Sequence, residues 1–302
     1  MKTPENIENG GILLVNKPSG CTSHDVVNKI RRAYNTKKVG HTGTLDPMAT
    51  GLLLVLVGKA VKASEYLLAG EKTYVAGIKF GLTTDSQDTT GKILTESSIL
   101  PTKEAYESVI STFVGNIKQI PPMYSALKVG GKKLCDLARE GVTLELEPRD
   151  ITIHYIKLID FNADGAKFEV RCSHGTYIRT LCHDMGQALG CGAVMSSLDR
   201  VCVDRFDISD SITLGELENM DEGAKISRLL PVERAFEEYP IVHLPPFYAR
   251  LFTNGNEIYQ KKIKTDFPVS QKLRVYVENE FAALAEIREF EDGTAVFGIK
   301  RF

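Results

Sequence analysis

The sequence has no long apolar run. Its longest uninterrupted aliphatic stretch is the six-residue segment 52–57, whereas a transmembrane helix needs about 20 apolar residues. The first ten residues, MKTPENIENG, contain no apolar segment that could serve as a secretory signal. We therefore expect a cytoplasmic protein that has no membrane partner.

Common metal and cofactor motifs are missing as well. The six cysteines include no Cys-x-x-Cys pair, which favours reduced thiols over a zinc site. Segment 51–59 has the wrong spacing for a phosphate-binding P-loop. The chain also has no Gly-x-Ser-x-Gly elbow and no His-Glu-x-x-His pair. The sequence therefore predicts neither a metal nor a cofactor.

The composition is that of an ordinary folded protein, with 302 residues, 43% apolar and 25% charged. This length suits one large domain or two unequal ones. The net charge of −2 does not by itself indicate a nucleic-acid partner, but the charge is unevenly distributed. Residues 16–62 hold eight basic and two acidic residues, and residues 207–240 hold nine acidic and three basic ones. A basic first half is compatible with a phosphate-binding face, although solvated helices explain it more simply.

Periodicity and turn signals predict an α/β (α+β) chain. Strands are expected over residues 11–15, 52–57, 72–80, 151–159, 167–172 and 198–206, and helices over 22–34, 60–69, 102–113 and 177–189. Residues 83–91 are expected to form a polar loop, and 213–216 to open a short capped helix. Residues 120–149 have little periodicity, which is typical of a functional insertion. Three further strands, over 272–278, 281–290 and 295–302, predict a small β module at the end of the chain.

Segment 41–51, HTGTLDPMATG, is the most unusual stretch. It places His41, Asp46 and three threonines between a basic helix and a buried strand. Loops held by rigid strands are where catalytic groups concentrate. From residue types alone, Asp46 is as well explained as a turn residue as it is as a catalytic carboxylate.

Several blocks, in order along the chain, resemble the TruB family of tRNA pseudouridine synthases. They are VNKPSG and TSHDVV within residues 15–27, KVGHTGTLDPMATGLL at 38–53, KTYVAGIKFGLTTDSQDTTG at 72–91, PPMYSALK and GGKKL within 121–134, and CSHGTYIRTL at 172–181. The resemblance implies an isomerase that converts uridine 55 in the T-loop of tRNA. It also implies a pseudouridine-synthase fold with a large mixed, mainly antiparallel sheet. Residues 1–235 would form the catalytic domain, and residues 240–302 a PUA-like RNA-binding module.

The same resemblance implies roles for individual residues. Asp46 matches the essential carboxylate, Tyr74 a tyrosine that stacks on the extruded uracil, and Arg179 an arginine whose bidentate contact keeps Asp46 ionised. His41 matches the histidine that fills the space of the flipped base. The other expected substrate contacts are Tyr177, Leu198, Lys17, Lys62 and Asp88. Core packing explains Leu198 equally well, and a structural role remains open for Lys17.

Residues 120–150 match the family's RNA-gripping thumb. Its basic residues are expected to contact phosphates without reading sequence, and they are Lys128, Lys132, Lys133 and Arg139. Cys135 stands where the family often has an aromatic residue, so stacking at that position is not predicted.

The expected partner is the elbow of tRNA, bound by a monomer. Two alternatives stay open, a non-catalytic tRNA-folding chaperone and a guide-RNA-dependent synthase. The presence of Asp46, Tyr74 and Arg179 together favours an enzyme. The lack of long lysine-rich tails favours the stand-alone form.

Overall fold

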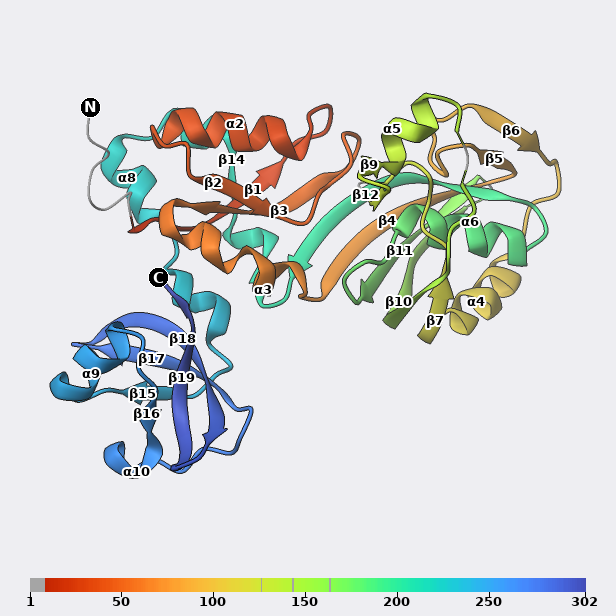
Figure 1. Ribbon diagram of the computed structural model, residues 1–302. Helices are drawn as coiled ribbons and strands as arrows, with labels where there is room; N and C mark the ends of the chain where they lie inside the picture. Colours follow the sequence, from red (N-terminus) through yellow and green to blue (C-terminus); the bar gives the residue numbers. More distant parts are fainter. Residues whose placement is uncertain (1–8, 126, 143, 163) are drawn as a thin grey trace.

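The computed structural model describes residues 9–125, 127–142, 144–162 and 164–302. Figure 1 shows a long upper body built on one large sheet, with a smaller β module below it. The strands of the large sheet run in the order β14-β1-β3-β12-β4-β11-β10-β7, with β13 paired to β12 and β2 paired to β3. Their bounds are β1 Gly11–Lys17, β2 Val39–Thr42, β3 Thr50–Val57, β4 Lys72–Phe80, β7 Gly115–Gln119, β10 Arg149–Asn162, β11 Gly165–Cys172, β12 Ala193–Val203, β13 Phe206–Asp207 and β14 Ile212–Thr213.

This sheet is mixed and mainly antiparallel, as predicted. Only the pairs β1–β14 and β3–β12 are parallel. Strands β3 and β4 begin within two residues of the predicted positions and end where predicted. In contrast, β12 begins at Ala193, five residues before the predicted start. Residues 83 and 84 of the expected polar loop belong to strand β5 (Leu82–Thr84), which pairs with β6 (Ile93–Glu96).

Strands β3 and β12 are paired along a short stretch, through two aligned residue pairs, Asp199 with Thr50 and Arg200 with Gly51. Gly51 is required at this point because its φ is +101°, and a Cβ there would lie 2.4 Å from the Arg200 carbonyl oxygen. The backbones of β3 and β12 therefore approach closely, and the loop that precedes β3 is brought beside β12.

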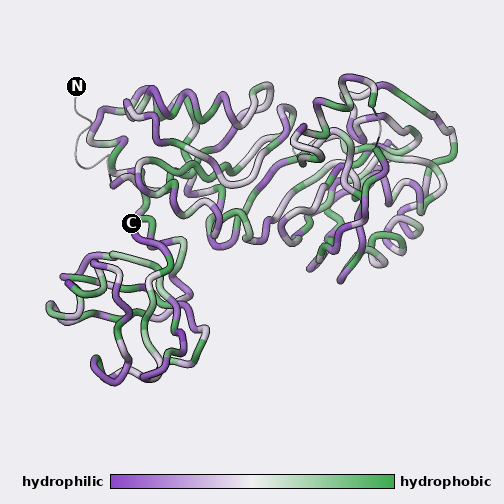
Figure 2. The backbone as a smooth tube through the Cα atoms, in the orientation of Figure 1, coloured by the Kyte–Doolittle hydropathy of each residue, from purple (hydrophilic) through white to green (hydrophobic). Residues whose placement is uncertain are grey.

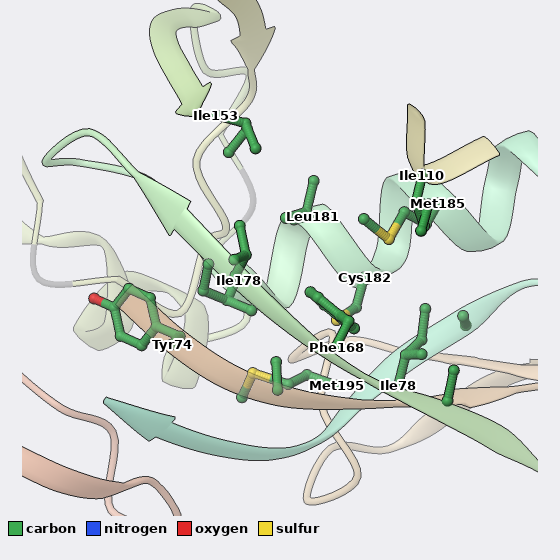
Figure 3. Packing of buried hydrophobic residues seen from close by; sticks show 14 of the residues in the cluster. Tyr74, Ile78, Ile110, Ile153, Phe168, Ile178, Leu181, Cys182, Met185 and Met195 are labelled. Carbon is green, nitrogen blue, oxygen red and sulfur yellow. The ribbon is translucent and has the colours of Figure 1, made fainter. Parts of the chain in front are cut away.

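Three amphipathic helices cover the sheet. Helix α2 (Ser23–Ala33) begins with a capping box, in which Thr22 and Asp25 satisfy each other's backbone N–H groups. Helices α4 (Lys103–Thr112) and α6 (Ile178–Ala188) contribute to the core over β4 and β11. Figure 3 shows Leu181, Cys182 and Met185 of α6 in this core. The hydropathy colouring of α2 in Figure 2 alternates along the helix, as expected for a helix with one buried face.

The expected helix over 60–69 is divided. Residues Gly58–Ala63 form a 3₁₀ helix, and α3 spans Ser64–Leu68. The insertion after β7 holds a two-stranded hairpin, β8 (Lys128–Val129) with β9 (Lys132–Lys133), followed by α5 (Leu134–Arg139). In Figure 1 this insertion lies on the upper side of the sheet, near β5 and β6.

The acidic stretch holds short helices that lead to the C-terminal module. They are a 3₁₀ turn Ile208–Asp210, α7 (Leu214–Glu218) with its predicted capping box, α8 (Glu222–Ser227) and a 3₁₀ helix Val232–Phe236. The module itself is a five-stranded sheet in the order β15-β17-β18-β19-β16. Its elements are β15 Ile241–His243, α9 Pro246–Thr253, β16 Ile258–Tyr259, α10 Gln260–Ile263, β17 Lys272–Val277, β18 Glu280–Phe290 and β19 Gly293–Arg301. Among the described residues, no helix is both long and apolar enough to cross a membrane.

An aromatic cluster joins the module to the large sheet's body. The Phe236 ring lies 5.4 Å from Tyr66, 5.9 Å from Phe281 and 5.6 Å from Phe302, measured between ring centroids. Residue 236 is almost completely buried in a core shared by both bodies. Such rings prefer edge-to-face and offset geometry, which fixes their relative orientation. The cluster therefore holds the C-terminal module in a defined position.

We expect Phe236→Ala to lower the free energy of unfolding by about 3–5 kcal/mol, because it removes a buried ring and leaves a cavity. The measurement is chemical denaturation followed by circular dichroism. The matched control is Phe247→Ala, since Phe247 lies on α9 and is 68% exposed. Equal stabilities of the two variants would contradict the anchoring role of Phe236.

Candidate active site

A cleft of about 1280 Å³ opens on the large sheet where β12 diverges from β3. Its walls come from the loop between β2 and β3, from β4, from residues 85–92, from the start of the insertion, from residues 173–179 and from β12. Every expected catalytic residue lines it, namely Asp46, Tyr74 and Arg179. Segments distant in sequence therefore meet at one cavity.

The loop that carries Asp46 is fixed from two sides. The Leu45 N–H donates to the Ser23 hydroxyl at 2.9 Å, and that hydroxyl donates to the Leu45 carbonyl at 3.1 Å. The Lys17 ammonium donates to the carbonyls of Pro47 at 3.4 Å and Ala49 at 2.7 Å. The backbone on both sides of Asp46 is thus tied to α2 and β1, and the carboxylate is held in one place.

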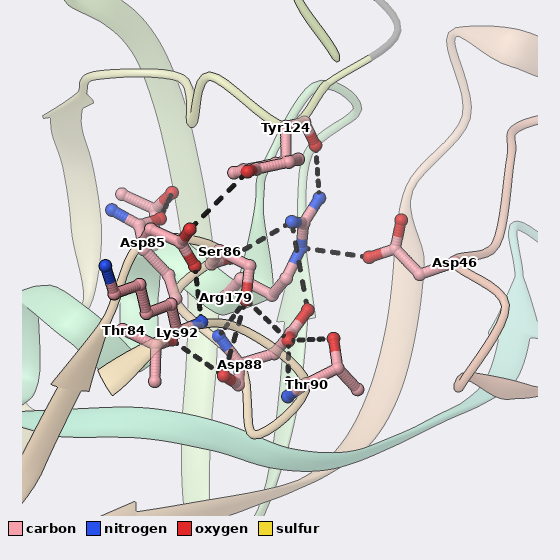
Figure 4. Close-up of polar contacts among 11 residues, drawn as sticks. Asp46, Thr84, Asp85, Ser86, Asp88, Thr90, Lys92, Tyr124 and Arg179 are labelled. Atoms are coloured by element: carbon pink, nitrogen blue, oxygen red, sulfur yellow. Dashed lines mark hydrogen bonds and ion pairs between the residues drawn. The ribbon is translucent and has the colours of Figure 1, made fainter. Parts of the chain in front are cut away.

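Asp46 and Arg179 form an ion pair at the centre of the site. The Nε of Arg179 lies 2.9 Å from Oδ2 of Asp46, and the Arg179 side chain is only 7% exposed while that of Asp46 is 34% exposed. Arg179 sits in the first turn of α6, whose packing on the core aims it into the cleft. Figure 4 shows the guanidinium between Asp46 and a group of polar residues on the opposite side.

The expected bidentate contact between Arg179 and Asp46 is wrong. Nη1 of Arg179 donates to the Ser86 carbonyl at 3.1 Å, and Nη2 donates to the Tyr124 carbonyl at 2.7 Å. These bonds engage Nη1 and Nη2, and Nε is the nitrogen that contacts the carboxylate. Oδ1 of Asp46 has no hydrogen-bond donor among the described residues.

Asp88 lies behind Arg179. Its Oδ2 is 3.9 Å from Nη1 of Arg179. Its Oδ1 accepts hydrogen bonds from the Ser86 hydroxyl at 2.7 Å and from the N–H and hydroxyl of Thr90 at 2.9 and 2.6 Å. Asp88 is buried, so it orders the 85–91 loop around the guanidinium more directly than it faces the cleft. The substrate contact expected of Asp88 stays a prediction.

Burial raises the pKa of the Asp46 carboxyl above its usual value. The Arg179 guanidinium opposes this shift, the Asp88 carboxylate adds to it, and the Lys17 ammonium opposes it. Since the net shift is upward, the ionised form of Asp46 is lost on acidification at a higher pH than for a free carboxyl group.

Tyr74 and the other expected pocket residues line the same cleft. Tyr74 is buried on β4, and Figure 3 shows its hydroxyl pointing away from the neighbouring apolar side chains. Tyr177 and Leu198 are half-buried cleft residues, and Leu198 also packs on the core, so both interpretations of it stand. His41 lies on β2. Its burial lowers the pKa of its imidazole, and the positive charge of the nearby Arg200 lowers this pKa further.

The contacts of two lysines bear on their expected roles. Lys17 is completely buried, and its ammonium donates to the carbonyls of Pro18, Pro47 and Ala49. An ammonium has three donors, so none remains for a phosphate and the structural role is the correct one. Lys62 is exposed but lies away from the cleft, and its ammonium donates to the Arg301 carbonyl at 2.9 Å.

The insertion is only partly described. Lys132 is exposed on β9 and forms an ion pair with Glu140 at 3.8 Å. The side chains of Lys128, Lys133, Cys135 and Arg139 lie outside what the structure describes. The phosphate contacts expected of this segment remain a prediction.

Three polar residues of the site were not predicted from the sequence. Arg200 and Lys72 are buried at the cleft beside Tyr74. Gln119, the last residue of β7, exchanges two hydrogen bonds with the backbone of Tyr177, at 3.0 and 2.8 Å. Lys72 opens the KTYVAG block that contains Tyr74, so its place in that motif was a signal that could have indicated a role at the site. Nothing local marked Arg200 or Gln119, because their roles depend on which distant segments they meet.

Solved structures and curated proteins resemble this chain over most of its length. A structure of an H/ACA RNP bound to a substrate RNA containing 2′-deoxyuridine matches with a TM-score of 0.74 and 25% identity, covering 100% of this chain and 87% of that chain. A Cbf5-Nop10-Gar1 complex matches with a TM-score of 0.73 and 26% identity at the same coverage. Curated proteins named tRNA pseudouridine synthase B include one from Dechloromonas aromatica, 44% identical and covering 91% of both chains. Another, from Alkaliphilus oremlandii, is 42% identical and covers 92% of this chain and 93% of the relative.

The fold and the cleft with its ion-paired Asp46 define a pseudouridine synthase. A model of the TruB family pseudouridylate synthase N-terminal domain matches residues 31–178, and one of the tRNA pseudouridylate synthase B C-terminal domain matches residues 179–237. The chain belongs to the TruB family, and it is an isomerase.

We expect Asp88→Asn to shift the acid limb of kcat/KM to lower pH. The change removes a negative charge that raises the pKa of Asp46, and the amide oxygen still accepts the Ser86 and Thr90 hydrogen bonds. The measurement is the pH profile of turnover, with Asp160→Asn on the exposed part of β10 as control. An acid limb that stays in place or moves upward would show that Asp88 does not act on Asp46 through charge.

Proposed function

We propose that this enzyme isomerises uridine 55 in the T-loop of tRNA to pseudouridine, acting as a monomer in the cytoplasm. The observation that carries the proposal is the ion pair of Asp46 with the buried Arg179, beside Tyr74 in one cleft. The relatives named tRNA pseudouridine synthase B support tRNA as the substrate, since they match more than nine-tenths of this chain. The isomerisation is neither a redox nor a phosphoryl-transfer reaction, so no cofactor is proposed.

The reaction breaks the C1′–N1 bond of uridine, turns the uracil and joins C5 to C1′. The hydrogen on C5 leaves as a proton, and N1 takes up a proton, so the overall change is an isomerisation. An ionised Asp46 serves as nucleophile toward the sugar or the base, or accepts a proton while the bond breaks. Each of these roles requires an unprotonated oxygen, and the single contact of Oδ2 with Arg179 leaves Oδ1 for the substrate.

A uridine inside a folded loop must leave its stack before the chemistry. We propose that the extruded uracil enters between Tyr74, Tyr177 and Leu198, whose aromatic and apolar surfaces line the cleft. His41, on the neighbouring strand, then occupies the place left by the base. Arg179 holds Asp46 in position throughout.

We further propose how the chain divides. Residues 1–235 form the catalytic domain, with residues 120–150 as its RNA-binding thumb, and residues 240–302 form a PUA-like RNA-binding module. The large and small sheets support this division, because residues 11–213 build the first and residues 241–301 the second. Lys62 lies at the junction of the two, where it remains a candidate phosphate contact.

Asp46→Asn is expected to abolish turnover while tRNA binding and folding are kept. Pseudouridine formation releases the hydrogen of C5, so the measurement is tritium release from a tRNA transcript labelled at C5 of its uridines. One tritium per tRNA is expected with the natural enzyme, and none with the variant. Because burial disfavours the ionised form of Asp46, the neutral amide should not lower the melting temperature.

The control substrate is the same transcript with its T-loop uridine replaced, which should release no tritium. Release from that transcript would place the target elsewhere. If the natural enzyme binds tRNA without any release, the chaperone or guide-dependent alternatives replace the proposal.

Removing charge at Lys132 and Lys133 should weaken tRNA binding and flatten its salt dependence. For each phosphate that the variant no longer neutralises, the slope of log K against log salt falls by about 0.7–0.9. The measurement is a binding titration over a series of salt concentrations. Lys103→Gln on α4 is the control, because Lys103 is exposed, lies outside residues 120–150 and is paired with Glu107. An unchanged slope in the double variant would contradict the thumb assignment.

A further inference from the structure

Arg200 is a buried cation that the proposed mechanism does not use. Among the described residues it is the largest fully buried side chain, at 1% exposed, and it lines the same cleft as Asp46 and Tyr74. In the part of the chain that the structure describes, no carboxylate lies within ion-pair distance of its guanidinium. A buried charge without a counter-charge costs several kcal/mol, so an arginine at this position needs a reason.

The contacts of Arg200 join the segments that build the site. Its Nε donates to the Leu52 carbonyl of β3 at 2.7 Å, and its Nη2 donates to the Gly43 carbonyl at 3.1 Å. Gly43 lies in the loop between His41 and Asp46. The guanidinium thus ties the start of the Asp46 loop to β3 and β12.

Arg200 also faces Tyr74 directly. The two residues are opposite each other in the β12–β4 register, and both line the cleft. Burial raises the pKa of the Tyr74 phenol, and the Arg200 charge opposes this. Burial lowers the pKa of the Lys72 ammonium to about 8, and the Arg200 charge is the next contribution to this shift.

We propose that Arg200 is a positioning residue for the isomerisation, which holds the Tyr74 hydroxyl in place beside Asp46. This inference rests on the proposed function, since the position of Tyr74 matters only if Tyr74 meets the substrate. A guanidinium suits this role better than a lysine ammonium does, because its planar fork directs several N–H donors in fixed directions.

A double-mutant cycle tests the inference. We expect Arg200→Met to lower kcat about 10²-fold, the cost of slightly misplacing a reacting group, with KM changed by less than about threefold. In the Tyr74→Phe background, where the hydroxyl is already absent, Arg200→Met should cost less than about threefold in kcat. Arg205→Met is the control, since Arg205 lies at the end of the same β12 hairpin, pairs with Glu237 and Glu238, and should leave kcat unchanged.

The same loss of kcat in both backgrounds would overturn the inference, because a merely structural role of Arg200 does not depend on the Tyr74 hydroxyl. If Arg200→Met does not fold, the cycle is repeated with Arg200→Lys, which keeps the charge and loses the fork, under the same criterion. A second readout needs no turnover: the NMR titration of Tyr74 should show a higher phenol pKa in Arg200→Met, and an unchanged pKa would also overturn the inference. This titration separates failure of the Arg200 role from failure of the proposed function, which a lack of tritium release by the natural enzyme would reveal.

Discussion

The Arg179 guanidinium connects more of this molecule than any single apolar contact does. Its three nitrogens reach Asp46 of the β2–β3 loop, Ser86 of the loop after β5 and Tyr124 at the start of the insertion. The group is planar and permanently charged, so these contacts cannot be exchanged without leaving a buried donor unpaired. The packing of α6 on the core fixes where the guanidinium lies. The position of the reactive carboxylate is therefore set by the hydrophobic core, through one charged side chain.

The single contact to Asp46 also has a chemical consequence. A carboxylate held by two parallel hydrogen bonds is well stabilised and correspondingly less reactive. Here Ser86 and Tyr124 occupy the other nitrogens, and burial raises the pKa of Asp46. Arg179 favours the ionised form of Asp46, but its single contact does not fully offset the effect of burial on the carboxylate. The arrangement thus retains an ionised oxygen that is more basic than an exposed aspartate, which suits attack on carbon or acceptance of a proton.

The sequence predicts the strands that depend on local pattern and misses those that depend on pairing. Strands β3 and β4 are continuous apolar or alternating runs, so their positions followed from the residues. Strands β14, β15 and β16 have two or three residues each and exist only because a distant strand pairs with them. The site divides in the same way. Motif resemblance pointed to Asp46, Tyr74 and Arg179, but it left Lys17 open between a structural role and a phosphate contact, because a lysine's partners are decided by burial in the folded chain.

The root of the proposed thumb, residues 119–124, is attached to the first turn of α6 and to Tyr177 just before it. Gln119, just before the insertion, pairs with the backbone of Tyr177, and Tyr124, just inside it, accepts from Arg179. A displacement of this root therefore acts on the residues that open α6, and through Arg179 on Asp46. Lys132, farther out on the insertion, pairs with Glu140 of the same segment. Changes at the tip should thus alter mainly the affinity for RNA, whereas changes at the root should alter the rate of the chemical step, even though both belong to one segment of chain.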